Sequence, residues 1–217
     1  MSFESKFVAP ASLAPRLMAR LRHTLALDPS HADDRVHSIY FDSGEEPAAA
    51  EVRNGDFYKA KVRVRWYGSS GPARSWLECK RKIGARRAKL RRPTKGIDPA
   101  WPLQHRGWRR VPEMLREVGE FADLGHVAPT LHLAYRRRRF VHRATGLRIA
   151  VDDNIRLLRV HPRHRDTTPP SNRPHGELVL EVKGNTRTLP REFAFLSDLG
   201  LRKSAFSKYG ICRGSAS

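Results

Sequence analysis

Cations alternate with apolar residues in several short segments, and this alternation constrains the fold more than any other feature of the chain. The clearest example is KVRVRWY at residues 61–67, in which Lys61, Arg63 and Arg65 are separated by valines. Successive side chains of a β-strand point to opposite faces, so this segment presents one cationic and one apolar face. We therefore predict a strand here, with its apolar face on a hydrophobic core.

Four further segments repeat the pattern, and three of them carry Glu and Lys two positions apart. These segments are residues 4–6, 76–82, 147–152 and 178–183. A half-buried strand that turns its charges to water would explain any one of them. Uncharged polar residues are nearly absent from the charged positions, however, although water accepts any polar group. A barrel offers another explanation, because its charged strand faces can line an interior lumen, and the repetition favours this reading.

The remaining patterns predict more strands and a few helices. Strands are expected at residues 4–8, 36–41, 58–67, 75–83, 130–141, 147–152, 155–160 and 177–183. Helices are expected at 13–27, after Pro112 through Val118, and at 190–199. Residues 43–57, 84–110 and 161–175 are predicted to be irregular, because they combine Pro, Gly or His with no clear period. The result is a mainly β (α+β) fold, an antiparallel sheet curled toward a barrel with covering helices. We expect a single domain over residues 1–217, with its core at about 3–210.

Composition restricts the partners and excludes several classes of protein. The 42 Lys and Arg residues exceed the 22 Asp and Glu residues, for a net charge of +20, so the expected partner is a polyanion. The sequence contains no run of about 18 apolar residues, so no transmembrane segment is predicted. The N-terminus lacks the layout of a secretory signal, which favours a cytoplasmic location. Cys79 and Cys212 are too few for a disulfide framework or a thiolate zinc site.

Interleaved cations and carboxylates suit the chemistry of phosphate chains. Phosphoryl transfer depends mainly on positioning and on stabilising spread negative charge, and Arg and Lys bind phosphate oxygens. A few carboxylates can hold Mg²⁺ or Mn²⁺, which prefer oxygen ligands. Strand faces that carry both residue types are therefore predicted to bind phosphate together with a divalent metal.

Eight short motifs occur in order between residues 4 and 209. They are Glu4-x-Lys6, Ser38-Ile39-Tyr40-Phe41-Asp42, Lys61-x-Arg63-x-Arg65-x-Tyr67, Leu77-Glu78-x-Lys80, Tyr135-x-Arg137, Arg148-x-x-x-Asp152, Glu181-x-Lys183 and Ser207-Lys208-Tyr209. Together they resemble the CYTH-like triphosphate tunnel metalloenzymes, and within that superfamily the catalytic domain of the vacuolar transporter chaperone (VTC) type. The CYTH branch opens with E-x-E-x-K, whereas Ser2 stands at the first Glu position here, which favours the VTC type.

The resemblance implies a closed, eight-stranded antiparallel tunnel in which cations grip a triphosphate. The implied activity is that of a polyphosphate polymerase, which moves the γ-phosphate of ATP onto inorganic polyphosphate with Mn²⁺ or Mg²⁺. The residues implied for catalysis are Arg63, Arg65, Lys80, Arg137 and Arg148. Those implied for binding triphosphate or polyphosphate are Lys6, Lys61, Lys183, Ser207 and Lys208, with Lys89 or Arg91 as a further ligand. The implied metal ligands are Glu181, Glu4, Glu78 and Asp152, of which the last three alternatively orient the cations.

Other functions stay open on the sequence. If water rather than a phosphate chain attacks, the enzyme is an inorganic tripolyphosphatase or a nucleoside triphosphatase. A non-catalytic protein that binds polyphosphate or nucleic acid would also carry many cations, and residues 81–92 could serve it as a surface arm. Such a surface would not need the carboxylates between the cations, so nucleic acid is the less favoured partner.

Overall fold

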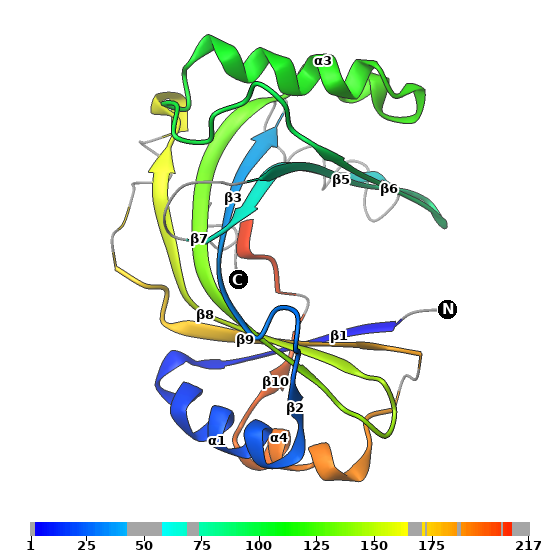
Figure 1. The fold of residues 1–217 in the computed structure, drawn as a ribbon, viewed down its shortest axis with the longest axis vertical. Coiled ribbons are helices and arrows are strands. Elements are labelled where there is room, and N and C mark those ends of the chain that lie inside the picture. The colour runs from blue at the N-terminus through cyan, green and yellow to red at the C-terminus, as the bar shows by residue number, and fades with distance from the viewer. Residues whose placement is uncertain are drawn as a thin grey trace. The chain divides into compact units, whose positions relative to one another are not determined.

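The strands form one sheet, mainly antiparallel, in the order β10-β1-β9-β8-β7-β3-β4-β5-β6, with β2 paired to β7 (Figure 1). The computed structural model describes residues 3–42, 58–68, 74–164, 171, 173–185, 188–204 and 206–209. The strands are β1 (Phe3–Pro10), β2 (Ala26–Leu27), β3 (Asp33–Asp42), β4 (Tyr58–Tyr67), β5 (Ser75–Ile83), β6 (Arg86–Pro93), β7 (Ala128–Val141), β8 (Arg148–Val160), β9 (Glu177–Gly184) and β10 (Arg202–Lys203). The prediction of a mainly β antiparallel fold with few helices is thus confirmed.

The sheet has ten strands rather than the eight that the resemblance implied. Two of the ten, β2 and β10, are only two residues long, so eight longer strands remain. The strands β10 and β6 lie at the two ends of the pairing order, and no pairing joins them among the described residues. Closure of the sheet into a barrel therefore stays a proposal.

The helices are short and few. They are α1 (Ala14–Thr24), α3 (Arg110–Arg116) and α4 (Phe195–Asp198), with 3-10 turns η1 (Ala11–Leu13), η2 (Arg106–Arg109), η3 (Gly119–Leu124), η4 (Pro162–His164) and η5 (Arg191–Phe193). The prediction that a helix follows Pro112 is wrong at its start, because α3 begins at Arg110 and holds Pro112 in its first turn, where proline is tolerated. In the described part of the chain, no helix is long and apolar enough to cross a membrane.

The chain divides into two compact units. The first comprises residues 1–35, 134–156 and 173–210, and the second comprises 36–133, 157–172 and 211–217. The strands β3, β7 and β8 contribute residues to both units. Each unit has a hydrophobic core of its own.

In the first unit, α1 covers the apolar face of the sheet. Its residues Leu17, Met18 and Leu21 are buried at helical spacing, while Arg16 and Arg20 are exposed. The core also takes residues from four strands and from the segment around α4, among them Ala9, Phe140, Ile149, Val151, Leu178, Leu180, Val182, Phe193 and Leu196. The helix ends at Thr24 and not at residue 27 as predicted, because Leu25 is already extended and residues 26–27 pair with β7.

In the second unit, α3 and η3 pack on the apolar face of β3, β4 and β5. The predicted bounds of β4 and β5 are confirmed. Their buried residues alternate with charged ones, as Val62, Val64, Leu77 and Cys79 show. The core is completed by Ile39, Phe41, Trp66, Ile97, Leu103, Trp108, Val111, Met114, Leu115, Phe121, Leu124 and Val127.

Two predictions about local structure are wrong in instructive ways. Residues 86–93 form the strand β6 inside a stretch that was predicted to be irregular, and they pair with β5 over their whole length. Residues 147–152 and 155–160 were predicted as two strands but belong to the single strand β8. Between them Asn154 has φ +50°, a left-handed conformation that asparagine tolerates better than most residues. This local break explains why the sequence resembles two strands.

Candidate functional site

In the first unit, the motif cations and carboxylates lie on one face of neighbouring strands. Lys6 of β1 is directly opposite Glu181 of β9, and Glu4 is opposite Lys183, which in turn is opposite Arg148 of β8. Lys183 Nζ lies 3.4 Å from a Glu181 oxygen and 3.6 Å from a Glu4 oxygen. Strand register therefore explains the E-x-K spacing: each carboxylate meets a lysine of the next strand.

Four charged side chains converge deeper in this unit, and we call them the Asp152 cluster: Arg137, Asp152, Glu181 and Lys208. Asp152 is fully buried and accepts two hydrogen bonds from Arg137, at 2.5 Å and 2.6 Å. Lys208 Nζ lies 2.5 Å from Asp152 Oδ2 and 3.8 Å from Glu181 Oε1. Arg137 also lies 3.5 Å from Glu181. Two cations and two carboxylates thus share one buried site, drawn from β7, β8, β9 and the segment after β10.

Mutual pairing keeps all four groups charged. Burial alone would raise the pKa of Glu181, but Lys208 and Arg137 outweigh it and lower that pKa to about 2. Burial would also raise the pKa of Asp152, but Lys208 and Arg137 outweigh it, so this pKa lies well below its usual range. Burial opposes the charge on Lys208, yet Asp152 and Tyr135 raise its pKa. The cluster therefore holds two fixed cations, and its carboxylates keep them ionised in a site with little water.

Tyr135 supports both cations of the Asp152 cluster, and its role was not predicted. The Arg137 guanidinium lies 5.4 Å from the centre of the Tyr135 ring, and Lys208 Nζ lies 5.0 Å from it. An aromatic face attracts cations at such distances. The Tyr135-x-Arg137 motif already drew attention to Tyr135, but the motif alone does not show that its ring contacts the two cations.

The lowered carboxylate pKa values predict acid sensitivity of the fold. A carboxylate whose pKa is lowered by folding stabilises the protein above its unfolded pKa, near 4.5 for Glu181, and loses this contribution as the pH falls toward 2. We expect the difference in unfolding free energy between wild type and Glu181→Gln to shrink between about pH 7 and about pH 3, measured by urea denaturation. Glu177→Gln is the control, because Glu177 is a more exposed carboxylate on the same strand. A difference for Glu181→Gln that is independent of pH would contradict the prediction.

The second unit holds a separate group, which we call the Glu78 cluster: Arg63, Arg65, Glu78 and Arg91. Arg63 donates to Glu78 Oε2 at 2.9 Å from Nε and approaches it at 2.7 Å with a second nitrogen. Arg65 and Arg91 each lie 3.6 Å from Glu78 oxygens. Burial would raise the pKa of Glu78, but Arg65 and Arg63 outweigh it, so the pKa is lowered. One carboxylate here orders three arginines.

Uncharged neighbours fix the orientation of these arginines. Arg65, which is buried, donates from Nε to Ser38 Oγ at 3.2 Å, and Arg63 reaches Tyr40 Oη at 3.5 Å. The Arg91 guanidinium lies 4.2 Å from the centre of a Trp76 ring. Ser38 and Tyr40 belong to the motif at residues 38–42, but their hydrogen bonds could not be inferred from it.

The structure distributes the predicted site residues between the two units. The first unit contains Glu4, Lys6, Arg137, Arg148, Asp152, Glu181, Lys183, Ser207 and Lys208, and the second contains Lys61, Arg63, Arg65, Glu78 and Lys80. Ser207 and Lys208 follow β10 and lie outside the strands, whereas the others lie on strands: Lys61, for example, is opposite Lys80 and both are exposed. Arg138, the next residue after Arg137, is nearly buried and paired with Asp153.

The residues of the Asp152 cluster fit a divalent metal that is partly held by substrate. Mg²⁺ is usually bound by one or two carboxylates together with phosphate oxygens. Asp152 and Glu181 are ionised and both approach Lys208, so their oxygens already converge on a cation. The described residues contain no group of three or more His, Cys, Asp or Glu side chains that could hold a metal ion. Glu78 is surrounded by arginines, which suits a carboxylate that orients cations better than one that binds metal.

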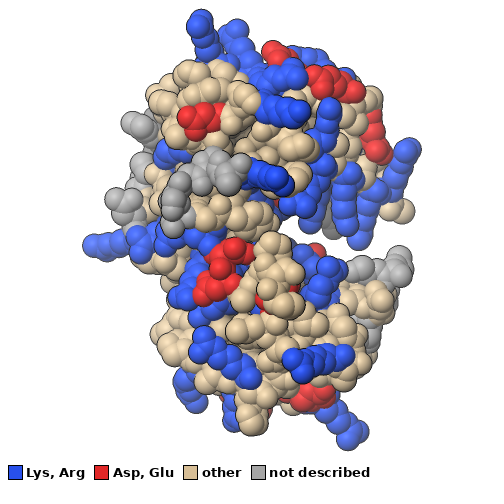
Figure 2. Space-filling view, viewed as in Figure 1, with Lys and Arg blue, Asp and Glu red and all other residues tan. Residues whose placement is uncertain are grey.

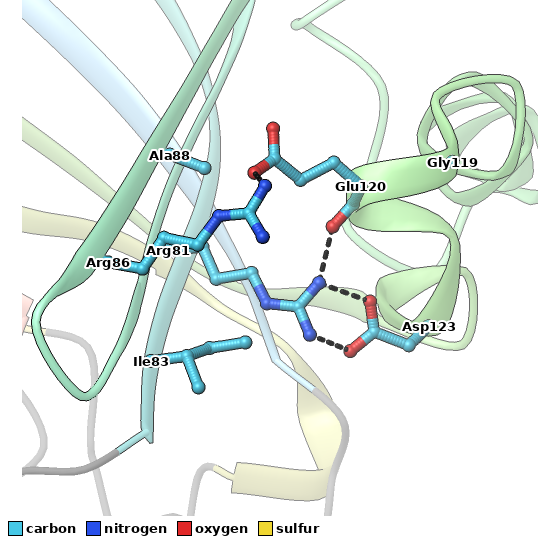
Figure 3. A pocket seen from close by; sticks show the side chains of 7 residues that line it. All are labelled: Arg81, Ile83, Arg86, Ala88, Gly119, Glu120 and Asp123. Carbon is cyan, nitrogen blue, oxygen red and sulfur yellow. Dashed lines mark hydrogen bonds and ion pairs between the residues drawn. The ribbon is translucent and has the colours of Figure 1, made fainter.

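A pocket of about 450 Å³ lies on the opposite face of β5 and β6 (Figure 3). Its cations are already neutralised: Arg81 donates two hydrogen bonds of 2.8 Å to Asp123, and Arg86 lies 3.5 Å from Glu120. These contacts attach the β5–β6 hairpin to η3. The charged residues that line this pocket therefore hold the hairpin against η3 and do not form an anion site.

Comparisons with known proteins agree with the fold and the motifs. The family model of the VTC domain matches residues 2–216. A candidate adenylate cyclase from Bacillus halodurans has a similar structure, with a TM-score of 0.53 at 11% identity, covering 95% of this chain and 94% of that chain. A Pyrococcus horikoshii protein has a TM-score of 0.51 at 13% identity, covering 97% of each chain. At these identities the two structures show a shared fold alone. No curated protein matches the chain.

Proposed function

The chain belongs to the VTC domain family, a family of triphosphate-tunnel-type phosphoryl transfer, and we propose that it is a polyphosphate polymerase that moves the γ-phosphate of ATP onto inorganic polyphosphate. The proposal includes closure of the charged strand faces into the tunnel that the resemblance implies. It also includes the assignment of the motif residues to phosphate and metal binding.

The Asp152 cluster is the observation that carries the proposal. A surface that binds polyanions needs only exposed cations, whereas Arg137 and Lys208 are only 12% and 10% exposed and are held by the buried carboxylates Asp152 and Glu181. Burying four charges is costly even when they are paired. An arrangement of this kind suits an enzyme, because pre-positioned charges stabilise a transition state without reorganising during the reaction.

In this mechanism the protein acts by position and charge. Arg63, Arg65 and Arg137 bind phosphate oxygens, and their guanidinium planes are fixed by Glu78, Ser38 and Asp152. Lys208 and Lys6 add point charges, and Lys6 also donates to the backbone oxygen of Phe206 at 3.3 Å. In each unit, such cations stabilise the negative charge that spreads as the phosphoryl group moves.

A divalent metal fits the Asp152 cluster. Glu181 would hold it, with Asp152 as the second carboxylate, and the bound metal would neutralise charge on the phosphate oxygens. The family is generally dependent on divalent metals, and Mn²⁺ or Mg²⁺ is part of the proposal.

The direct test is incubation of the purified protein with ATP and Mn²⁺, followed by gel detection of polyphosphate and an assay of free phosphate. We expect chains that lengthen with time. Release of phosphate without chains would replace the proposal with a tripolyphosphatase or a nucleoside triphosphatase. If neither product forms with Mn²⁺ or Mg²⁺, the protein is not an enzyme of this class and is better described as a polyanion-binding protein.

A further inference from the structure

The cationic face of β5 and β6 continues past the Glu78 cluster toward the tip of the hairpin. Residues that are opposite one another form three rows across these two strands: Glu78 with Arg91, Lys80 with Lys89, and Lys82 with Arg87. Every member of the rows except Glu78 is a cation. In Figure 2, Lys and Arg side chains stand side by side along β5 and β6.

The outer row, Lys82 with Arg87, and the neighbouring row, Lys80 with Lys89, contain no carboxylate. Lys82, Arg87 and Lys89 form no ion pair in the described part of the chain, although Lys82 is only half exposed. On the opposite face of the hairpin, by contrast, Arg86 is paired with Glu120 and Arg92 with Glu117. The charge of the outer row is therefore available to a ligand.

The spacing of the rows matches an extended chain of charges. Two residues along a strand span about 6.8 Å, so three rows cover about 14 Å. Three linked phosphates occupy only part of this length. A triphosphate bound at Lys80 and Arg63 would not reach the outer row, Lys82 with Arg87. Phosphates farther along a longer chain would bind there.

We propose that Lys82 and Arg87, continued inward by Lys89, form an outer subsite for long-chain polyphosphate that a triphosphate does not reach. The inference rests on the proposed function and adds a preference for chain length to it. Lys82 and Arg87 contact the distal part of the chain and increase its affinity, and they take no part in binding ATP.

A phosphate chain suits this face better than nucleic acid does. Trp76 is the one aromatic residue on this face of β5 and β6, and the Arg91 guanidinium already lies over its ring. Proteins that bind single-stranded nucleic acid combine cations with aromatic rings on which bases stack. The outer row offers charge without stacking, which a chain of bare phosphates requires.

The test compares two double variants that each remove two positive charges from the hairpin. Lys82→Ala with Arg87→Ala removes the outer row, and Arg86→Ala with Arg92→Ala removes two arginines from the opposite face. Dissociation constants are measured by calorimetry for long-chain polyphosphate and for tripolyphosphate at one fixed salt concentration. We expect the first variant to weaken binding of polyphosphate by roughly five- to thirty-fold, as for two exposed charge contacts, and to leave tripolyphosphate within about twofold. The control variant should bind both as the wild type does.

Each other outcome has a definite meaning. Wild-type protein that binds neither compound contradicts the proposed function itself. If wild type binds both and the Lys82 and Arg87 variant binds polyphosphate unchanged, the outer subsite is wrong while the proposed function stands. Equal losses in the two variants would show a general effect of net charge and would also overturn the subsite. Duplex DNA that displaces polyphosphate, and that loses affinity in the same variant, would identify nucleic acid as the occupant instead.

Discussion

Replacement of Asp152 by Asn should lower the free energy of unfolding by about 3–5 kcal/mol, because it leaves buried cations without their main partner. Asn keeps the size of the side chain but removes the charge that meets Arg137 at 2.5 Å and Lys208 at 2.5 Å. Glu181 remains, at 3.5 Å from Arg137 and 3.8 Å from Lys208, which is too far to replace two short contacts. The loss would be a large part of the stability of about 5–15 kcal/mol that is typical of a folded protein. Urea denaturation at neutral pH measures it.

The neighbouring residue offers a matched control. Asp153 pairs with only Arg138 among the residues that the structure describes, and burial outweighs Arg138 and raises the pKa of the Asp153 carboxyl. Asp153→Asn should therefore cost clearly less than Asp152→Asn. Removing Lys208 as well, by Lys208→Met in the Asp152→Asn protein, should recover part of the lost stability, because one unpaired cation is gone. Equal losses for the two Asn variants, or no recovery in the double variant, would contradict the assigned role of Asp152.

Much of the strand framework could be predicted because the alternation of charge and apolar side chains is a local property. The bounds of β4 and β5 follow from Val62, Val64, Leu77 and Cys79, which must face a core. The strand β6 has the same alternation, with Ala88 and Leu90 between cations, but its apolar residues are small or few and its basic surroundings conceal them. Its structure depends on hydrogen bonds to β5, which no local pattern reveals.

The sequence predicts which residues belong to the candidate site better than it predicts which of them contact one another. Motif spacing placed the charged residues of each segment on one strand face. The pairing of Asp152 with Lys208 joins residues 56 positions apart, and it depends on where the segment after β10 passes β8. Short-range patterns contain no such information. The same limit explains why Tyr135, Ser38 and Tyr40 were not assigned as supports for the cations.

Carboxylates in this protein have two different tasks, and the distinction decides which of them to test for metal binding. Glu78 is enclosed by three arginines, and Asp152 has short contacts to both of its cations. Glu181 is ionised, yet its ion pairs with Arg137, Lys183 and Lys208 are all 3.4–3.8 Å long. A carboxylate with long contacts gives up less when it turns to a metal, so Glu181 is the better metal ligand.

Glu181→Gln should accordingly abolish metal-dependent turnover while the protein stays folded. Gln keeps the size of the side chain and one oxygen, but it lacks the negative charge that a hard cation requires. We expect turnover of ATP with Mn²⁺ to fall by at least about a hundredfold, and Mn²⁺ binding, followed by electron paramagnetic resonance in the presence of tripolyphosphate, to weaken in parallel. Glu177→Gln, the same change on the same strand, should alter neither quantity. Full activity in Glu181→Gln would exclude Glu181 as the metal ligand, whereas lost turnover with unchanged Mn²⁺ binding would limit its role to holding Lys208 and Arg137 in place.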